Sequence, residues 1–501
     1  MVLKKIWMDW HSWLGLKMSL LMLIICVTGT ISVVSHEIDW LIDSDLRIDA
    51  QQAPIDWDAM TLKAKKAYPE RRLSFIQRPI YSNSASILLM NDPFLGARRV
   101  HSNPYTGEVL GDKPWYSSVQ RIFRDLHRYL LSPVAGIYLV GPFGIILLLS
   151  VISALLFYKK WWRGFFKLRL NKGYRAFIGS LHKVTGLWSI WFILLISLTG
   201  VWYLAEAVIR DVGVKIQFKR PNVSEQTWSD RQLLETTILP SKAVAIAKAQ
   251  YTHFDVASIY FPTTQARPIM ITGYTDIPLV RARSNSVFID PVTGEVLDVR
   301  RTQQQTLLEI WIDLADPLHF GDFGGLWTKV IWFIFGLAIC ALSATGLIIF
   351  IKRIKQRHNT PFGRKVWGNG RYAIYAILII PAFFGILLFA KSMDWLPRPH
   401  VIANQIVSIQ DAKASLILSK KDDIYYLSIV PIGQNLLLPV EPVVILSDGT
   451  IIPFLRKNRV INIDSARLSK EQLKKIKSIV WQQDKRLYYS LSLEQGIFTW
   501  I

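Results

Sequence analysis

Residues 181–200 read LHKVTGLWSIWFILLISLTG, a histidine-led apolar stretch that ends in a Thr-Gly pair. The same plan occurs near the N-terminus, where His11 precedes an apolar run with a Thr-Gly pair at Thr28. The spacing from His182 to Thr199 equals the spacing from His11 to Thr28. Apolar runs of about 20 residues cross the hydrocarbon of a bilayer as helices. The pattern predicts two membrane helices, each with a histidine at its start.

Two further histidines extend this duplication. Leu-His pairs at His127 and His319 each introduce another apolar run. The spacing from His127 to Ser153 equals the spacing from His319 to Thr345. The hydroxyl residues Ser153 and Thr345 therefore occupy equivalent positions in two repeated halves.

A duplicated turn supports the repeat. NPYTGEVL at 103–110 and DPVTGEVL at 290–297 match almost residue for residue, and their Pro and Gly residues predict a strand–turn–strand unit. Both copies begin on the same side of the membrane. The sequence thus predicts a parallel repeat about an axis along the membrane normal.

Composition fits membrane helices combined with aqueous domains. The 501 residues are 51% hydrophobic, too apolar for an ordinary soluble protein of this size and too polar for a pure helix bundle. Five predicted spans lie at about 14–35, 134–158, 184–205, 327–351 and 372–390.

The net charge of +22 does not indicate nucleic-acid binding, because the basic residues cluster beside the predicted spans. Short basic loops stay cytoplasmic, so the N-terminus is expected in the cytoplasm and the C-terminus outside. The clusters are Lys4 and Lys5, then Lys159, Lys160, Arg163, Lys167, Arg169, Lys172 and Arg175, then Lys352, Arg353, Lys355, Arg357, Arg364, Lys365 and Arg371.

The aqueous segments show mixed patterns. Each outside domain is expected to begin with a helix, at Asp56–Tyr68 and Ser241–Tyr251, and to continue as short strands. The C-terminal segment after the fifth span alternates like strands, with an amphipathic helix predicted at Ser469–Gln483. A separate α+β or β-rich domain is expected there.

Four histidines at equivalent repeat positions are candidate haem ligands. His11 and His182 lie at the cytoplasmic ends of spans one and three, and His127 and His319 at the outside ends of spans two and four. A twofold axis lets each pair face inward, and electron-transfer haems take two axial ligands from facing helices. The alternative is four interfacial histidines bonded to carbonyls or headgroups. Ionisable groups at membrane depth usually mark function.

His36 is an alternative outside ligand. Counted from His11, about seven turns of a continuous helix return it to nearly the same face. Its repeat equivalent, Ala207, is no ligand. The remaining histidines are interpreted as surface residues without partners at metal-ligand spacing. They are His101, His253, His358 and His400.

The two predicted haems lie far apart for a single electron-transfer step. A straight first span puts its ends roughly 37 Å apart. Either the ligands lie deeper, the haem edges lean inward, or aromatic residues relay electrons. The candidate aromatics are Trp188, Trp191, Trp327 and Trp332, for which packing is the simpler role.

The histidine-led helices, the duplicated Pro-x-Thr-Gly-Glu-Val-Leu turn and the Leu-His pairs resemble the PepSY-associated transmembrane proteins, often called iron-regulated membrane proteins. The resemblance covers roughly residues 1–355. It implies an inner-membrane ferric-siderophore reductase with two b-type haems and PepSY-like outside domains. By resemblance, His11 and His182 ligate the cytoplasmic-side haem. His127 and His319 ligate the outside haem.

The expected fold class is an α-helical integral membrane protein. A duplicated two-helix repeat forms a four-helix bundle, joined by a fifth span, two α+β PepSY-like periplasmic domains and a C-terminal periplasmic domain. The spans are 1–39, 126–160, 181–207, 318–352 and 372–391; the PepSY-like domains are 40–125 and 208–317; the cytoplasmic loops are 161–180 and 353–371; the last domain is 392–501.

The expected function is electron transfer through the bacterial inner membrane to a periplasmic ferric siderophore or another ferric chelate. The chain has no Gly-x-Gly-x-x-Gly fingerprint and no flavin domain, so quinol or a separate reductase must supply electrons. Two alternatives are a membrane-tethered PepSY protein that binds or regulates a peptidase without redox activity, and a siderophore or peptide permease. Arginines that could attract an anionic chelate are Arg71, Arg72, Arg98, Arg99, Arg281 and Arg283.

Overall fold

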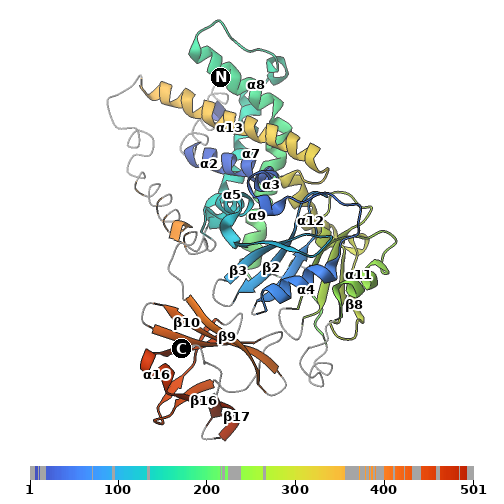
Figure 1. The fold of residues 1–501 in the computed structure, drawn as a ribbon. Coiled ribbons are helices and arrows are strands. Elements are labelled where there is room, and N and C mark those ends of the chain that lie inside the picture. The colour runs from blue at the N-terminus through green and yellow to red at the C-terminus, as the bar shows by residue number, and fades with distance from the viewer. Residues whose placement is uncertain are drawn as a thin grey trace.

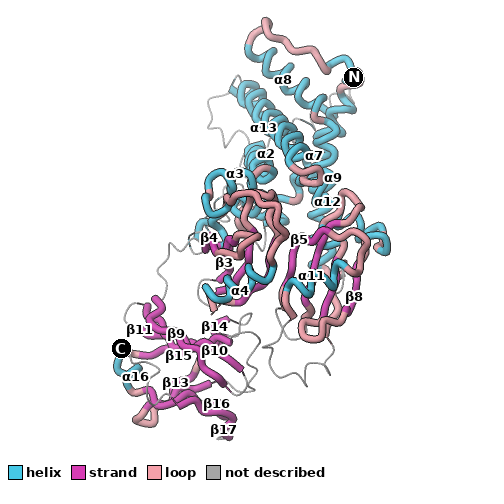
Figure 2. Tube along the Cα trace, turned by 45° about the vertical axis from the view of Figure 1, so that its right-hand side comes forward, coloured by secondary structure: helices cyan, strands magenta, loops and turns pink. Residues whose placement is uncertain are grey.

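The chain forms a helical part, a large sheet beside it and a C-terminal unit of strands, as Figures 1 and 2 show. This computed structural model describes residues 6–8, 11, 19–69, 71–92, 96–132, 136–214, 216, 220–223, 238–262, 267–355, 372, 379, 383, 385–387, 390, 400–409, 412–421, 424–431, 442–458, 463–483 and 486–492.

Among the residues that the structure describes, three helices are long and apolar enough to cross a membrane: Gly136–Phe157, Ile190–Asp211 and Leu326–Ile349. They comprise α6 (Gly136–Val140) with α7 (Pro142–Phe157), α9 (Ile190–Asp211) and most of α13 (Leu326–Lys355). These helices match predicted spans two, three and four. The fifth predicted span lies almost entirely outside the described residues.

The first span is bent, contrary to the continuous helix that the sequence suggests. The helices α2 (Ser19–Val33) and α3 (Ser35–Ile42) meet at 64°. The hydroxyls of Thr28, Thr30 and Ser32 each donate to a carbonyl one turn earlier in α2. Such back-bonding bends helices, so this run of small polar residues accounts for the bend.

Apolar side chains from four helices meet in one cluster. It contains Val151 of α7, Phe192 and Ile193 of α9, and Trp332 and Ile339 of α13. Residues of α2 pack against the same cluster. The helices thus share one apolar core beside the histidines.

Three further helices connect this core to the rest of the chain. They are α5 (Val119–Tyr129), α8 (Tyr174–Trp188) and α12 (Leu307–Phe320). A break at Ser189 separates α8 from α9, so predicted span three is two helices. Figure 1 shows α8 at the end of the helical part away from the sheet, and α5 and α12 near the sheet.

The two predicted outside domains share one eight-stranded sheet, in the order β4-β3-β2-β1-β5-β6-β7-β8. The halves join where β1 pairs antiparallel with β5, with Ile76 opposite Ile259. The strands are β1 (Arg72–Gln77), β2 (Ser86–Asp92), β3 (Gly96–Ser102), β4 (Val109–Pro114), β5 (Asp255–Tyr260), β6 (Ile269–Tyr274), β7 (Ser286–Ile289) and β8 (Val296–Arg300).

One face of the sheet is covered by two helices, α4 (Trp57–Ala67) and α11 (Pro240–Lys248) (Figure 1). Because strand side chains alternate between faces, Val287 and Ile289 enter the core under these helices. Ser286 and Phe288 instead line a cavity that reaches the histidines. Neighbouring residues of β7 therefore serve the fold and the candidate site.

The duplicated turns connect β3 to β4 and β7 to β8, as predicted. Gly107 and Gly294 have φ values of +72° and +77°, which favour glycine. The side chains of Asn103 and Asp290 accept two backbone N–H groups each at equivalent positions. The matching residues thus build matching turns.

The C-terminal unit contains two sheets, β14-β15-β11-β10-β9 and β13-β12-β16-β17. The predicted helix Ser469–Gln483 is wrong: α16 covers Lys470–Lys474, and β16 covers Ile476–Gln483. Ser469 starts the helix with a capping box, but the β-branched residues after it favour a strand. The other strands are β9 (His400–Ile409), β10 (Ala412–Lys421), β11 (Ile424–Pro431), β12 (Pro442–Leu446), β13 (Ile451–Pro453), β14 (Leu455–Asn458), β15 (Ile463–Leu468) and β17 (Arg486–Ser492).

Candidate functional site: two histidine pairs

His11 and His182 form one pair, which we call the far pair because α8 lies away from the sheet (Figure 1). Their ring centres are 6.4 Å apart and their planes meet at 74°. His11 Nδ1 lies 2.9 Å from the Ser150 carbonyl and 3.3 Å from Ser153 Oγ. His182 Nδ1 lies 3.0 Å from Thr345 Oγ1. Each ring is thus anchored by a residue of its own repeat.

His127 of α5 and His319 of α12 form a second pair, which we call the sheet-side pair. Their ring centres are 6.1 Å apart and their planes meet at 42°. His127 Nδ1 lies 2.8 Å from the Ile25 carbonyl, and His319 Nδ1 lies 2.7 Å from Thr199 Oγ1. Each pair therefore joins one histidine from each half.

The hydrogen bonds determine where the ring protons are. Thr345 Oγ1 donates to the Ala341 carbonyl at 2.7 Å, and Thr199 Oγ1 donates to the Leu195 carbonyl at 2.8 Å. A hydroxyl has one proton, so both threonines accept from histidine Nδ1–H. Carbonyl groups can only accept, which gives His127 and His11 the same tautomer. In the described part of the chain no hydrogen bond engages Nε2 of these rings, so four Nε2 lone pairs remain for a ligand.

The spacing within each pair fits a shared metal ion. Metal–imidazole bonds are about 2 Å long, and the ring centre lies about 1 Å behind its nitrogen, so two rings ligating one ion from opposite sides have centres about 6 Å apart. The observed 6.4 and 6.1 Å agree with this value. The two imidazoles of either pair are residues that would hold an iron porphyrin if one were bound.

Strong helix starts position the sheet-side histidines. The carboxylate of Asp39 accepts from the backbone N–H groups of Val119 and Gln120 at 2.7 and 3.1 Å, at the start of α5. A capping box of Thr306 and Glu309 begins α12. Carboxylates at a helix N-terminus satisfy free N–H groups and oppose the helix dipole favourably.

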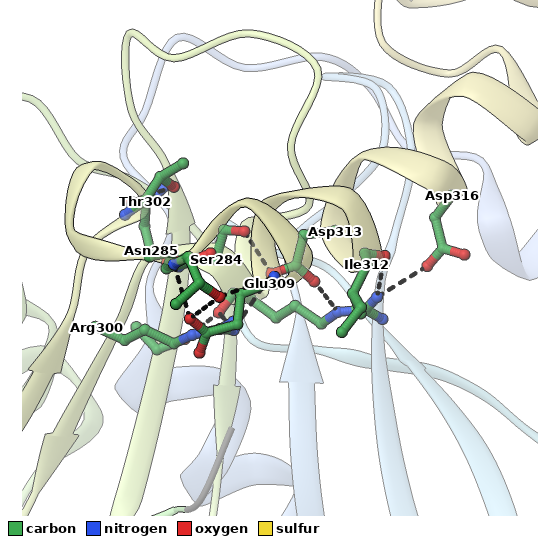
Figure 3. A network of polar contacts seen from close by, with 12 residues as sticks. Ser284, Asn285, Arg300, Thr302, Glu309, Ile312, Asp313 and Asp316 are labelled. Carbon is green, nitrogen blue, oxygen red and sulfur yellow. Dashed lines mark hydrogen bonds and ion pairs between the residues drawn. The ribbon is translucent and has the colours of Figure 1, made fainter. Parts of the chain in front are cut away.

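A buried carboxylate attaches α12 to the sheet (Figure 3). Asp313 is 1% exposed and accepts from the Ser284 hydroxyl and from Arg283 Nε. Arg300 Nη1, at the end of β8, lies 3.3 Å from Asp313 Oδ2, the oxygen that accepts from Ser284. These contacts fix α12 ahead of His319 and hold that ring in place.

A cavity of about 490 Å³ opens beside the sheet-side pair. His127 and His319 line it, together with Gly29 and Gly200, the glycines of the duplicated Thr-Gly pairs. A Cβ atom on Gly29 would lie 2.7 Å from His127 Cε1, so this ring position requires glycine. A Cβ atom on Gly200 would meet only Gly144 Cα, at 3.6 Å.

Residues of the helices and of the sheet line the cavity, and both apolar and charged side chains are among them. The charged lining residues are Arg124, Arg128, Glu206, Arg210, Arg220, Arg283, Arg300, Glu309, Asp313 and Asp316. The volume lies in the range of cofactor and ligand pockets.

The sheet-side histidines lie further inside the helical part than the sequence suggests. His127 contacts Ile25 within α2, not the end of span one. Thr199 is the anchor of His319. The stretch from His182 to Thr199 would span about 25 Å as one straight helix, and the break at Ser189 makes this an upper limit. This separation replaces the wider one expected from a straight first span and favours ligands placed inside the helical part.

Two of the four candidate relay tryptophans lie near the sheet-side pair. Trp332 Nε1 donates to the Leu318 carbonyl, and its ring lies 6.0 Å from that of Trp191. Trp188 and Trp327 are 49% and 81% exposed, as lipid-facing or interfacial residues would be.

His36 does not join either pair. It follows the bend in the first span, so the helical periodicity that linked it to His11 does not apply. It is not among the residues that line the cavity. Among the described residues, its ring contacts neither His127 nor His319.

His101 is not a surface residue, contrary to the sequence interpretation. It is 1% exposed and lies close to Asp43 and Asp45. Burial, followed by the charge of Arg99, lowers the pKa of His101 to about 4 and keeps the ring neutral at neutral pH. Nothing in the sequence spacing indicated this cluster, because both aspartates lie far from His101 along the chain. His253 is exposed, His400 begins β9, and His358 lies outside the described residues.

The arginines proposed to attract a chelate are engaged within the fold. Arg71 and Arg98 both pair with Asp112, and Arg281 pairs with Asp322. Arg72 donates to a backbone carbonyl, Arg99 is 7% exposed, and Arg283 pairs with Asp313. These residues therefore form no free cationic surface.

A family model described as "PepSY-associated TM region" matches residues 8–353. The chain belongs to this family. The PepSY-associated TM region includes both repeats and both histidine pairs, and it ends before the C-terminal unit. This confirms the membership of the family that the sequence indicated.

One curated relative matches a short part of the chain. It is the uncharacterized protein PA4219 of Pseudomonas aeruginosa, 33% identical over 76 residues. The match covers 15% of this chain and about a fifth of the relative's length, 19%.

Proposed function

We propose that this PepSY-associated membrane protein holds two b-type haems, one at each histidine pair, and transfers electrons through the bacterial inner membrane to a periplasmic ferric siderophore. The observation that supports this most is the fourfold arrangement of imidazoles. In both pairs the ring centres lie about as far apart as bis-imidazole ligation requires, and Nδ1 of every ring has an acceptor.

The residues around the pairs fit such a group. A bound haem supplies an iron centre that takes up and releases single electrons. Acceptors at Nδ1 fix the tautomer and raise the basicity of Nε2, as outer-shell partners of metal-bound histidines do. Gly29 and Gly200 leave room beside the sheet-side rings, while Arg124 and Arg128 provide positive charge for carboxylate substituents.

The proposed reaction needs an electron donor and a ferric acceptor. Quinol, which releases two electrons and two protons on oxidation to quinone, or a separate reductase would supply electrons at the far pair. Each ferric ion of the chelate would gain one electron at the sheet side and become ferrous, so one quinol would reduce two ferric ions. Hard oxygen ligands hold ferric iron more tightly than ferrous iron, so reduction loosens the chelate. In this proposal the N-terminus is cytoplasmic, and the sheet and C-terminal unit are periplasmic.

Absorption spectroscopy of the full-length protein tests the proposal. Protein from haem-replete cells should show a reduced b-type spectrum with two haems per chain. His182→Ala and His319→Ala should each remove one haem and leave the other. A folded but colourless protein would refute the proposal and favour a tethered binding module.

A further inference from the structure

A second buried histidine site lies where the first span meets the sheet, outside the cavity described above. Asp43 ends α3, Asp45 lies in the 3-10 turn η1 (Ser44–Leu46), and His101 lies on β3. One ligand atom from each lies within 4.8 Å of the others. Lys113 of β4 pairs with both carboxylates, at 3.0 Å from Asp45 Oδ2.

His101 has no hydrogen-bond partner in the described part of the chain, although its side chain is only 1% exposed. Both ring nitrogens lack one. Nδ1 lies 3.9 Å from Asp43 Oδ2, too far for a hydrogen bond but close enough to share an ion. Buried polar atoms without partners are costly, so an imidazole in this position calls for a ligand.

The backbone makes room for this cluster. Gly111 lies opposite His101 in the β3–β4 pairing. A Cβ atom at Gly111 would lie 2.3 Å from Asp45 Oδ2. Because Gly111 has no side chain, the Asp45 carboxylate can lie on the same face of the sheet as the His101 ring.

The second repeat shows that the fold itself does not need a histidine here. Aligning the duplicated turns places Phe288 at the position of His101 and Arg300 at the position of Lys113. Phe288 is 1% exposed, so an aromatic hydrocarbon fills this position in the other half. An unpartnered imidazole therefore occurs at this position in the first repeat and not in the second.

We propose that Asp43, Asp45 and His101 bind a divalent first-row transition-metal ion, and that the ion displaces Lys113 from the two carboxylates. Ligands about 2.0–2.2 Å from a metal lie at most about 4.4 Å apart, so the three atoms must approach by a few tenths of an ångström. The Lys113 side chain is 32% exposed and can turn to solvent.

The donor set defines the class of ion. Imidazole suits zinc and ferrous iron, while carboxylates also accept manganese. Three protein ligands leave positions for water. A bound ion would link the end of the bent first span to β3, independently of the haems proposed above.

Equilibrium dialysis of the full-length protein, stripped of other metals, against Co²⁺, followed by elemental analysis of cobalt per chain, tests the site. The wild type should bind one Co²⁺ that Zn²⁺ displaces. His101→Phe, which installs the residue of the second repeat, should weaken this binding at least tenfold. The exposed His253→Phe is the matched control and should leave it unchanged.

Lys113→Met provides a test in the opposite direction. Removing the competing ammonium should tighten Co²⁺ binding about tenfold, a gain that a misfolded variant would not show. If His101→Phe binds Co²⁺ like the wild type, or Lys113→Met binds no more tightly, the cluster is only a lysine-neutralised ion pair and the proposal is wrong.

Discussion

Thr199→Val removes one hydroxyl from behind one candidate ligand. Valine keeps the shape of the side chain but cannot accept the proton that His319 Nδ1 donates at 2.7 Å. The His319 ring then has no acceptor for its Nδ1–H group, so no hydrogen bond favours the tautomer in which Nε2 is unprotonated. We expect the variant to weaken haem binding at the sheet-side pair alone.

The expected loss follows from two independent quantities. A buried donor left without an acceptor costs about 1–3 kcal/mol. Loss of an outer-shell partner of a metal-bound histidine lowers affinity about 10- to 100-fold, which is about 1.4–2.7 kcal/mol at 25 °C. The two ranges overlap, so the variant should lose haem about 10 to 100 times more readily at one of two sites.

Thr28→Val is the control that the repeat provides. Thr28 occupies the equivalent position, but its hydroxyl donates only to the carbonyls of Ile24 and Ile25. His127 bonds the Ile25 carbonyl itself, which this substitution keeps. Haem transfer to an excess of a haem-binding protein, followed by absorbance, measures both variants. Equal loss from both, or no loss from Thr199→Val, would refute the tautomer argument.

Three further substitutions test the site and its support. Gly29→Ala should prevent haem binding at the sheet-side pair, because the added methyl group would lie 2.7 Å from the His127 ring. Haem absorbance per chain should therefore fall. Gly179→Ala is the control and should keep both haems, because its methyl group would have no atom within 4 Å. Asp313→Ala should lower the free energy of unfolding by about 1–3 kcal/mol, because it leaves the buried Ser284 hydroxyl without its acceptor. Ile76→Ala, at a fully buried position of the strand that joins the two half-sheets, should cost about 2–5 kcal/mol in a melting experiment.

The sequence predicted the histidine partners better than their depth. Equal spacings in the two halves identified equivalent positions, and the structure brings His11 to His182 and His127 to His319. Spacing along one chain reports which residues are equivalent. It does not report the level at which helices from the other half cross, so the depth of His127 beside Ile25 could not be predicted.

The pairing of the two half-sheets was beyond sequence reasoning. Alternating patterns predicted the strands of both outside domains, but not the β1–β5 pairing that merges them into one sheet. Such a pairing depends on which strand edges remain exposed after each half folds. The cluster around His101 arises in the same way, since the turn at η1 places Asp45 against a strand far along the chain.

His36 shows how a local bend decides a ligand assignment. A straight helix would place His36 on the face of His11, but the 64° bend after Val33 carries it onto α3. His36→Ala should therefore retain both haems, whereas His127→Ala should retain only the one at the far pair. Haem content per chain distinguishes the variants. Loss of a haem from His36→Ala, with both retained in His127→Ala, would mean that the outer iron is held from α3 and that the sheet-side pair is structural.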